Sequence, residues 1–213
     1  MTPDGRRLEI ANVNATSVEG RLGTDLIYYH EHTRSFILVQ YKRISLTDKT
    51  ITVDDRLRRQ LGRLEAVASL SQAPRQPHDW RMGADACFLK LAKRPAKGQL
   101  SQELANGMYL PLSYVRLLLE DDCTLGPRGG RVLGYGTVER HATGAQLVQL
   151  IQHGLAGTVG TTVEQLKRFS IQRAEKDRTG AVIAAERSSE TVRQRQQRVN
   201  SRSPKKRART RSR

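Results

Sequence analysis

Residues 20–43 read GRLGTDLIYYHEHTRSFILVQYKR and contain two apolar runs on either side of a polar turn. The runs at residues 26–29 and 36–44 are rich in β-branched and aromatic side chains, which favours β-strands. Three polar side chains stand at the ends of these runs, namely Asp25 at the start and Gln40 and Lys42 at the end. The segment therefore predicts a β-hairpin whose polar residues need a separate explanation.

The geometry of such a hairpin brings these three residues together. If the turn is centred between residues 32 and 33 and is two or four residues long, Asp25 lies opposite Gln40. Directly opposed residues share one face of the sheet, with Cβ atoms about 4.5–5.5 Å apart. Lys42 follows Gln40 by two positions and so points to the same face. A carboxylate, an amide and an ammonium could then surround one divalent cation, provided that the register does not slip by one residue.

The segments around the hairpin predict a mixed α/β arrangement. One short strand is expected within residues 8–18, and a further strand within residues 86–93. Between the hairpin and that last strand, leucines recur at helical spacing and predict a helix over residues 55–70, capped by Asp54 or Asp55. The order strand, strand, strand, helix, strand indicates an α/β or α+β fold with a mixed sheet and flanking helices.

The later part of the chain is predicted to be mainly helical. Helices are expected over residues 112–122 and 143–154, and a third is expected to begin at Thr161. Thr161 and Glu164 fit a capping box for this third helix, which would place Val163 on its inward face.

Composition divides the chain into three parts: a core over residues 1–94, a helical accessory region over 95–187 and a basic tail over 188–213. The tail holds ten Lys or Arg residues and one acid, so it carries +9 of the net charge of +16 and leaves +7 for the rest. It has too few apolar residues to offset the entropy of ordering, so we expect disorder. Its Lys205, Lys206 and Arg207 would attract phosphate without regard to sequence.

Several classes of protein are disfavoured by the composition. No run of 18 or more apolar residues exists, and the start MTPDGRRLEI lacks the apolar segment of a secretory signal, so no membrane association is expected. Cys87 and Cys123 form no CxxC pair, which disfavours a disulfide framework or a zinc site. We expect a cytoplasmic protein, nucleoid-associated in a bacterium or nuclear in a eukaryote.

The segment GTDLIYYHEHTRSFILVQYKR resembles the core of the PD-(D/E)XK nuclease superfamily. It is most similar to the Mrr-type restriction endonuclease and Holliday-junction resolvase branches, in which a G-x-D strand precedes a strand ending in (Q/E)-x-K. The resemblance implies a restriction-endonuclease-like fold, with Asp25, Gln40 and the backbone carbonyl of Tyr41 binding Mg²⁺ or Mn²⁺. It also implies that Lys42 positions or polarises the attacking water.

The chain departs from the family pattern at three places. Thr24 stands where the family name has proline, and Gln40 replaces an acid, as is typical of the Q-x-K branch. The family usually has a helix with a further glutamate before the first strand, and here Glu19, or more remotely Glu9, could take that part. The resemblance covers roughly residues 8–93.

These observations favour a Mg²⁺-dependent DNA endonuclease acting in restriction, defence or repair, with RNA as the other possible substrate. A homodimer would allow it to cut two strands. The arginine stripe of the predicted helix, formed by Arg56, Arg59 and Arg63, would contact the phosphate backbone. Two alternatives stay open: a nucleic-acid-binding protein that retains the fold without cleaving, and a structural or assembly protein that acts through its tail. The polar residues of the hairpin could also form an ordinary solvated face.

Overall fold

The computed structural model describes residues 8–13, 17–45, 47, 49–92 and 107–176. All of them belong to the first of two compact units, Met1–Ala181. The second unit, Val182–Arg213, lies outside the described residues, as do the predicted basic tail and its nucleic-acid-binding residues Lys205, Lys206 and Arg207.

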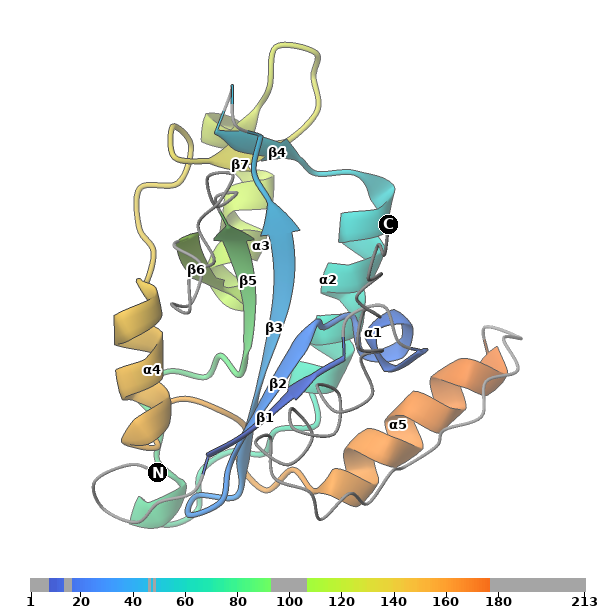
Figure 1. Cartoon of the computed structure of the whole chain (residues 1–213), viewed down its shortest axis with the longest axis vertical. Coiled ribbons are helices and arrows are strands. Elements are labelled where there is room, and N and C mark those ends of the chain that lie inside the picture. The colour runs from blue at the N-terminus through green and yellow to red at the C-terminus, as the bar shows by residue number, and fades with distance from the viewer. Residues whose placement is uncertain (1–7, 14–16, 46, 48, 93–106, 177–213) are drawn as a thin grey trace, which may run out of the picture. The chain divides into compact units, whose positions relative to one another are not determined.

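A mixed five-stranded sheet forms the centre of the described part, in the order β1-β2-β3-β5-β6 (Figure 1). β1, β2 and β3 are antiparallel neighbours, β3 and β5 are parallel, and β5 and β6 are antiparallel. A parallel pair needs a crossover connection, and helix α2 lies within the connection between β3 and β5. The strands are β1 (Leu8–Asn12), β2 (Leu26–His30), β3 (Ser35–Arg43), β5 (Cys87–Ala92) and β6 (Gly107–Pro111). The predicted α/β class is confirmed.

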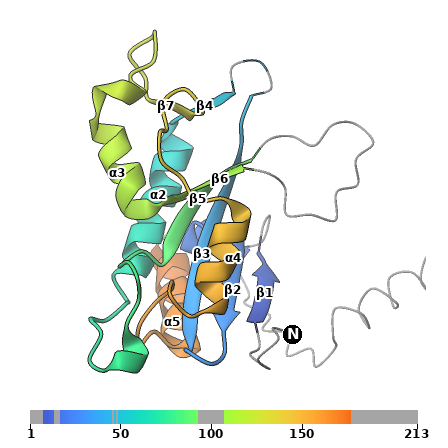
Figure 2. The same cartoon turned by 90° about the vertical axis from the view of Figure 1, so that its left-hand side faces the viewer.

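Helices cover both faces of this sheet (Figures 1 and 2). On one face α1, α2, α3 and α5 contribute to a large apolar core, which includes Leu38 and Leu89 of the sheet. On the other face α4 packs Leu147 and Ile151 against a second cluster. The helices are α1 (Ser17–Leu22), α2 (Asp55–Ala68), α3 (Leu112–Glu120), α4 (Gly144–Gln152) and α5 (Val163–Lys176). Of the helices in the described ranges, none is long and apolar enough to cross a membrane.

Helix α2 follows the sequence prediction closely. The side chain of Asp54 accepts a hydrogen bond from the Leu57 amide at 2.7 Å, so Asp54 caps the helix. Leu57, Leu61 and Leu64 are buried on one side, as their spacing predicts. This burial fixes α2 against the face of the sheet that carries Gln40 and Lys42.

The predicted start of α5 is wrong by one position. Thr162 and Gln165 form the reciprocal capping hydrogen bonds, at 2.7 and 3.2 Å, instead of Thr161 and Glu164. Thr161 is buried and donates its hydroxyl to the backbone of the segment after α2, so it cannot serve as the cap. The shift also leaves Val163 41% exposed, where the sequence predicted an inward position.

Two further elements complete the site region. β4 (Thr50–Thr52) and β7 (Val132–Gly134) form a separate two-stranded sheet beyond the end of β3. β6 lies in the part of the chain that the sequence predicted to be mainly helical. It is a strand because its short apolar run pairs with β5 and completes the main sheet.

Candidate active site

The hairpin register predicted from the sequence is confirmed. β2 pairs with β3 so that Leu26 opposes Val39 and His30 opposes Ser35, around a four-residue turn. Asp25 precedes β2 directly, and its amide donates to the Val39 carbonyl at 3.0 Å. Asp25 therefore stands at the position across from Gln40.

Asp25 and Gln40 are in direct contact. The carboxylate oxygen Oδ2 of Asp25 accepts hydrogen bonds from Gln40 Nε2 and from the Tyr41 amide, both at 2.5 Å. Gln40 Nε2 also donates to the Tyr41 carbonyl at 3.1 Å. Asp25 is 5% exposed and Gln40 is 1% exposed. The other amide atom, Gln40 Oε1, is buried and has no hydrogen-bond partner within the part of the chain that the structure describes.

Helix α1 brings Glu19 to the same place. Gln60 of α2 donates to Glu19 Oε1 at 3.4 Å, and Arg56 of α2 lies 3.8 Å from the same oxygen. The Glu19 charge is close enough to raise the pKa of Asp25. Glu9, by contrast, pairs with Tyr29 on the outer strand β1, away from Asp25. Of the two glutamates that the sequence offered, the structure thus places Glu19 beside the site.

Burial governs the ionisation of the site. The pKa of the Asp25 carboxyl is raised, first because burial disfavours its charged form, although the Tyr41 amide opposes this. The pKa of the half-buried Lys42 is lowered, first by burial and then by the nearby Arg56, whereas the charges of Asp54 and Asp25 oppose the shift. Lys42 is therefore within electrostatic range of Asp25, as the alternation of side chains along β3 predicts.

The loop before Asp25 is fixed by two residues of the GTD motif. Gly23 has a φ of +71°, and a Cβ there would lie 2.4 Å from the Gln60 carbonyl, so only glycine lets α2 approach this loop. The Thr24 hydroxyl is fully buried and lies 2.9 Å from the Leu26 carbonyl and 3.0 Å from that of Val39. Together they direct the Asp25 side chain towards Gln40.

A cleft of about 400 Å³ opens beside Lys42. It lies between the end of β3, strand β4 and the N-terminus of α2, and its lining is largely polar. Its lining residues are Lys42, Arg43, Ser45, Thr50, Ile51, Thr52, Asp54 and Leu57. The cleft gives a ligand access to Lys42. A larger cavity of about 710 Å³ lies between α3 and α4, and its lining includes none of the predicted site residues.

Of the three arginines in the predicted stripe, Arg56 has a contact with a site residue. Arg56 reaches Glu19, as described, whereas Arg59 is exposed on α2 and Arg63 is half-buried near Gly23. Sequence reasoning missed Gln60, which is 5% exposed and contacts Glu19. A glutamine on the inward side of an amphipathic helix was the signal that could have revealed it.

The residues present have the chemistry that Mg²⁺ or Mn²⁺ requires. These ions prefer oxygen ligands, and here Asp25 Oδ2 and the Tyr41 carbonyl both face the Gln40 amide. A half-turn of that amide would exchange Nε2 for the unpartnered Oε1 and turn a third oxygen towards the other two, which would have to move apart to admit an ion. Within the described ranges no cluster of three or more His, Cys, Asp or Glu side chains could hold a metal ion. An ion here would therefore depend on the amide and the carbonyl as well as on the acids Asp25 and Glu19.

No model of a known protein family matches the chain, and no curated protein matches it significantly in sequence.

Proposed function

We propose that this protein is a divalent-metal-dependent nuclease that hydrolyses phosphodiester bonds in DNA. The observation that carries the proposal is the contact of Asp25 with Gln40 and the Tyr41 peptide, with Lys42 and Glu19 in electrostatic range. An ammonium that lines an open cleft, with a buried acid and a buried amide behind it and a second acid nearby, is a set of groups suited to phosphoryl chemistry.

The order of the strands supports this proposal. An antiparallel β1-β2-β3 meander is followed by helix α2 and by β5, which is parallel to β3. This is the arrangement that the resemblance to the PD-(D/E)XK nucleases implies for a sheet followed by a helix and another strand. The position of Asp25 on the loop before β2, and of Gln40 and Lys42 near the end of β3, supports the same proposal.

Each residue has a distinct part in the proposed reaction. Asp25, Gln40 and the Tyr41 carbonyl would hold Mg²⁺ or Mn²⁺, and Glu19 would add a further carboxylate. The bound ion would lower the pKa of a water molecule and neutralise charge on the phosphate. Lys42 lines the cleft, where its ammonium would stabilise the negative charge that develops on the phosphate oxygens.

The basic residues around the cleft favour a nucleic acid as the substrate. Arg43 lines the cleft with Lys42, and Arg56 and Arg59 are exposed on the adjacent helix α2. Such cations bind phosphates irrespective of base sequence, with an affinity that falls as salt increases.

One observation favours a second function, which is nucleic-acid binding without cleavage. Both acids already have partners in the protein, because Asp25 accepts two hydrogen bonds and Glu19 lies near both Arg56 and Gln60. A network of this kind can persist as part of a fold that holds no ion. Such a protein would bind DNA equally well with and without a chelator.

A cleavage assay with matched variants separates these functions. The full chain is incubated with supercoiled plasmid, a four-way DNA junction and single-stranded RNA, each with Mg²⁺, Mn²⁺ or EDTA. Asp25→Asn and Lys42→Met remove one functional group each. Asp122→Asn, whose side chain is 93% exposed, and Lys167→Met, on the surface of α5, are the controls.

We expect metal-dependent cleavage of at least one DNA substrate. Asp25→Asn and Lys42→Met should lower the rate by on the order of 10²-fold or more, and the controls should not. Equal rates in all variants, or cleavage in EDTA, would refute the proposed site. Salt-sensitive binding without cleavage under any condition would favour the second function.

A further inference from the structure

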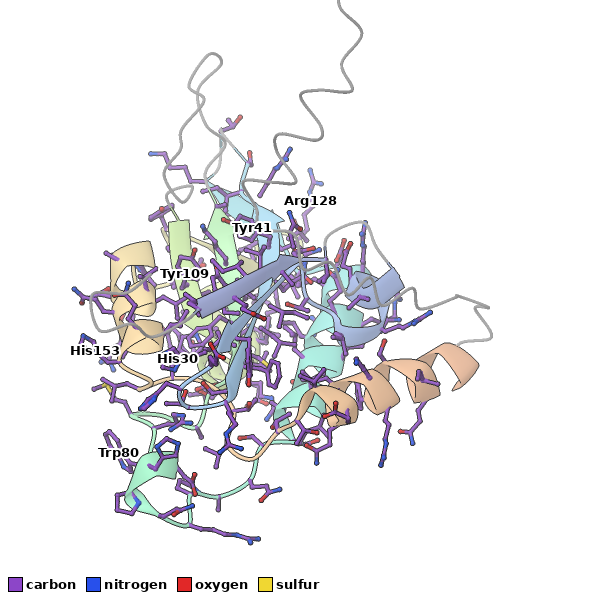
Figure 3. All side chains as sticks on the ribbon, turned by 60° about the horizontal axis from the view of Figure 1, so that its bottom comes forward. His30, Tyr41, Trp80, Tyr109, Arg128 and His153 are labelled. Carbon is purple, nitrogen blue, oxygen red and sulfur yellow. The ribbon has the colours of Figure 1, made fainter. Side chains whose placement is uncertain are left out.

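Lys90 is a fully buried lysine in the middle of the sheet, on the face opposite Asp25. It is 0% exposed and is the one basic residue in the otherwise apolar strand β5, CFLKLA. Tyr41 of β3 and Tyr109 of β6 are its partners in the neighbouring strands. The three side chains thus form one row across three strands, and Figure 3 labels the two tyrosines.

Both rings contact the lysine. Its Nζ lies 4.4 Å from the centre of the Tyr41 ring and 4.6 Å from that of Tyr109, and it donates a hydrogen bond to the Tyr41 hydroxyl. Two aromatic faces and a hydroxyl partly replace the water that the ammonium has lost. Within the described ranges no carboxylate lies in ion-pair distance of Lys90.

Packing alone gives no reason for a lysine here. Burial lowers the pKa of Lys90 to about 8, which reflects the cost of keeping its charge away from water. An apolar side chain of similar length would avoid that cost, as replacements of buried charges in other proteins often do. The contact with the Tyr41 hydroxyl is what such a replacement would lose.

Tyr41 joins this row to the candidate active site through its own backbone. Its side chain lies on the Lys90 face, while its amide donates to Asp25 Oδ2 and its carbonyl accepts from Gln40 Nε2. Any rotation of this residue about the strand axis would move the carbonyl away from Asp25 and Gln40. The orientation of the Tyr41 peptide is thus held from both faces of the sheet.

We propose that Lys90 is a positioning residue for the ion site: by holding the Tyr41 side chain on one face, it fixes the Tyr41 carbonyl as an ion ligand on the other. This inference rests on the proposed function, because it assumes that Asp25, Gln40 and Tyr41 bind an ion. It adds a residue that touches neither the ion nor the substrate.

The test measures Mn²⁺ binding to the full chain, without a nucleic acid. Lys90→Met removes the donor and the charge but keeps the length of the side chain. Tyr41→Phe keeps the ring and removes only the hydroxyl that Lys90 contacts, and it serves if Lys90→Met does not fold. Lys167→Met is the control for loss of an exposed lysine. Calorimetry gives the affinity, and the relaxation of water protons by bound Mn²⁺ reports the water molecules on the ion.

We expect Lys90→Met and Tyr41→Phe each to weaken Mn²⁺ binding by about 10–100-fold, the usual range for groups that orient a metal ligand. The double variant should lose little more than Tyr41→Phe alone, because both changes break the Lys90 contact and only Tyr41→Phe also removes the hydrogen bond to Tyr109. Relaxation per bound Mn²⁺ should rise, since a water molecule replaces the misplaced carbonyl. A role in folding alone would change stability without that rise.

The outcomes separate this inference from the proposed function. If the unmodified protein binds no Mn²⁺, the proposed ion site itself is wrong. If the unmodified protein binds Mn²⁺ and both single variants bind it equally well, the ion site stands and the role of Lys90 is refuted. Additive losses, or unchanged water relaxation, would also refute positioning through Tyr41.

Discussion

The Nε2 atom of Gln40 lies 2.5 Å from Oδ2 of Asp25, across the pairing of β2 with β3. This contact places an amide where a second acid would bind a divalent cation more tightly, because a carboxylate binds a hard cation more strongly than an amide does. The amide has a compensating property in the absence of an ion. Its NH₂ group donates to Asp25 and to the Tyr41 carbonyl, so it neutralises the oxygens that would otherwise repel one another.

Gln40→Glu should lower the stability of the ion-free protein and raise its affinity for an ion. Without an ion, the new carboxylate would repel Asp25 and would lack the donor for the Tyr41 carbonyl, so the melting temperature in EDTA should fall. With Mn²⁺, the added charge should tighten binding by about tenfold or more. Thermal unfolding with and without Mn²⁺, together with calorimetry, measures both effects. Gln149→Glu on the exposed side of α4 is the control and should change neither.

The parts of the site that the sequence predicted depend on local pattern. The register that opposes Asp25 and Gln40 follows from the turn and from two apolar runs that lie next to each other in the chain. Helix α2 follows from leucines at helical spacing and from Asp54 at its start. The alternation of side chains along β3 then places Lys42 on the same face as Gln40.

The parts that the sequence did not predict depend on contacts between distant segments. Helix α1 has only six residues, too few to give a clear periodic signal, and it is held by its packing against α2 and α5. The row of Tyr41, Lys90 and Tyr109 exists only because β5 lies between β3 and β6, and sequence order does not reveal that neighbourhood. The cap of α5 fell on Thr162 because Thr161 is used in a contact with the segment after α2.

Gly23→Ala should destabilise the protein and displace the loop that carries Asp25. The added Cβ would lie 2.4 Å from a backbone oxygen of α2, and the positive φ disfavours any side chain, so we expect a loss of roughly 1–3 kcal/mol in the free energy of unfolding. Gly62→Ala is a matched control in α2, where a Cβ meets no atom within 4 Å. It should stabilise the helix by about 1 kcal/mol. Urea unfolding of both variants checks the opposite signs, and equal effects would contradict the role assigned to Gly23.

Asp25→Asn should make the ion-free protein more stable while it abolishes ion binding. The pKa of Asp25 is raised by burial, so the folded state binds a proton more tightly than the unfolded state does. The folded state therefore loses stability as the pH rises from 3.8, the ordinary pKa of the group, through the raised pKa. At neutral pH the asparagine avoids that cost. The variant should therefore melt at a higher temperature than the unmodified protein in EDTA, with a smaller difference in acid.

Added Mn²⁺ should reverse the order of stability between Asp25→Asn and the unmodified protein. It stabilises only the protein that binds it, by an amount set by its concentration relative to Kd. A lower melting temperature of the variant in EDTA would instead show that the ionised Asp25 is net stabilising through its two hydrogen bonds. That result would favour the function without cleavage.

The free energy of unfolding should rise with pH because the pKa of Lys90 is lowered in the folded state. Its pKa is lowered from 10.5 to about 8 in the folded state, so between these values the unfolded chain binds more protons and the free energy of unfolding rises with pH. The rise is on the order of 3 kcal/mol at most, since one pKa unit corresponds to about 1.4 kcal/mol. Lys42 contributes in the same direction, because its pKa is also lowered.

Lys90→Met isolates this contribution, because it keeps Lys42. Urea unfolding between about pH 8 and 10 should give a shallower slope of stability against pH for Lys90→Met than for the unmodified protein. Lys167→Met should keep the original slope. Burial raises the pKa of Tyr28, Tyr41 and Tyr109, so their titration in the unfolded chain opposes this rise near the top of the window in both proteins. Identical slopes for Lys90→Met and the unmodified protein would mean that Lys90 keeps its ordinary pKa. Water would then reach its ammonium in spite of the packing of Tyr41 and Tyr109.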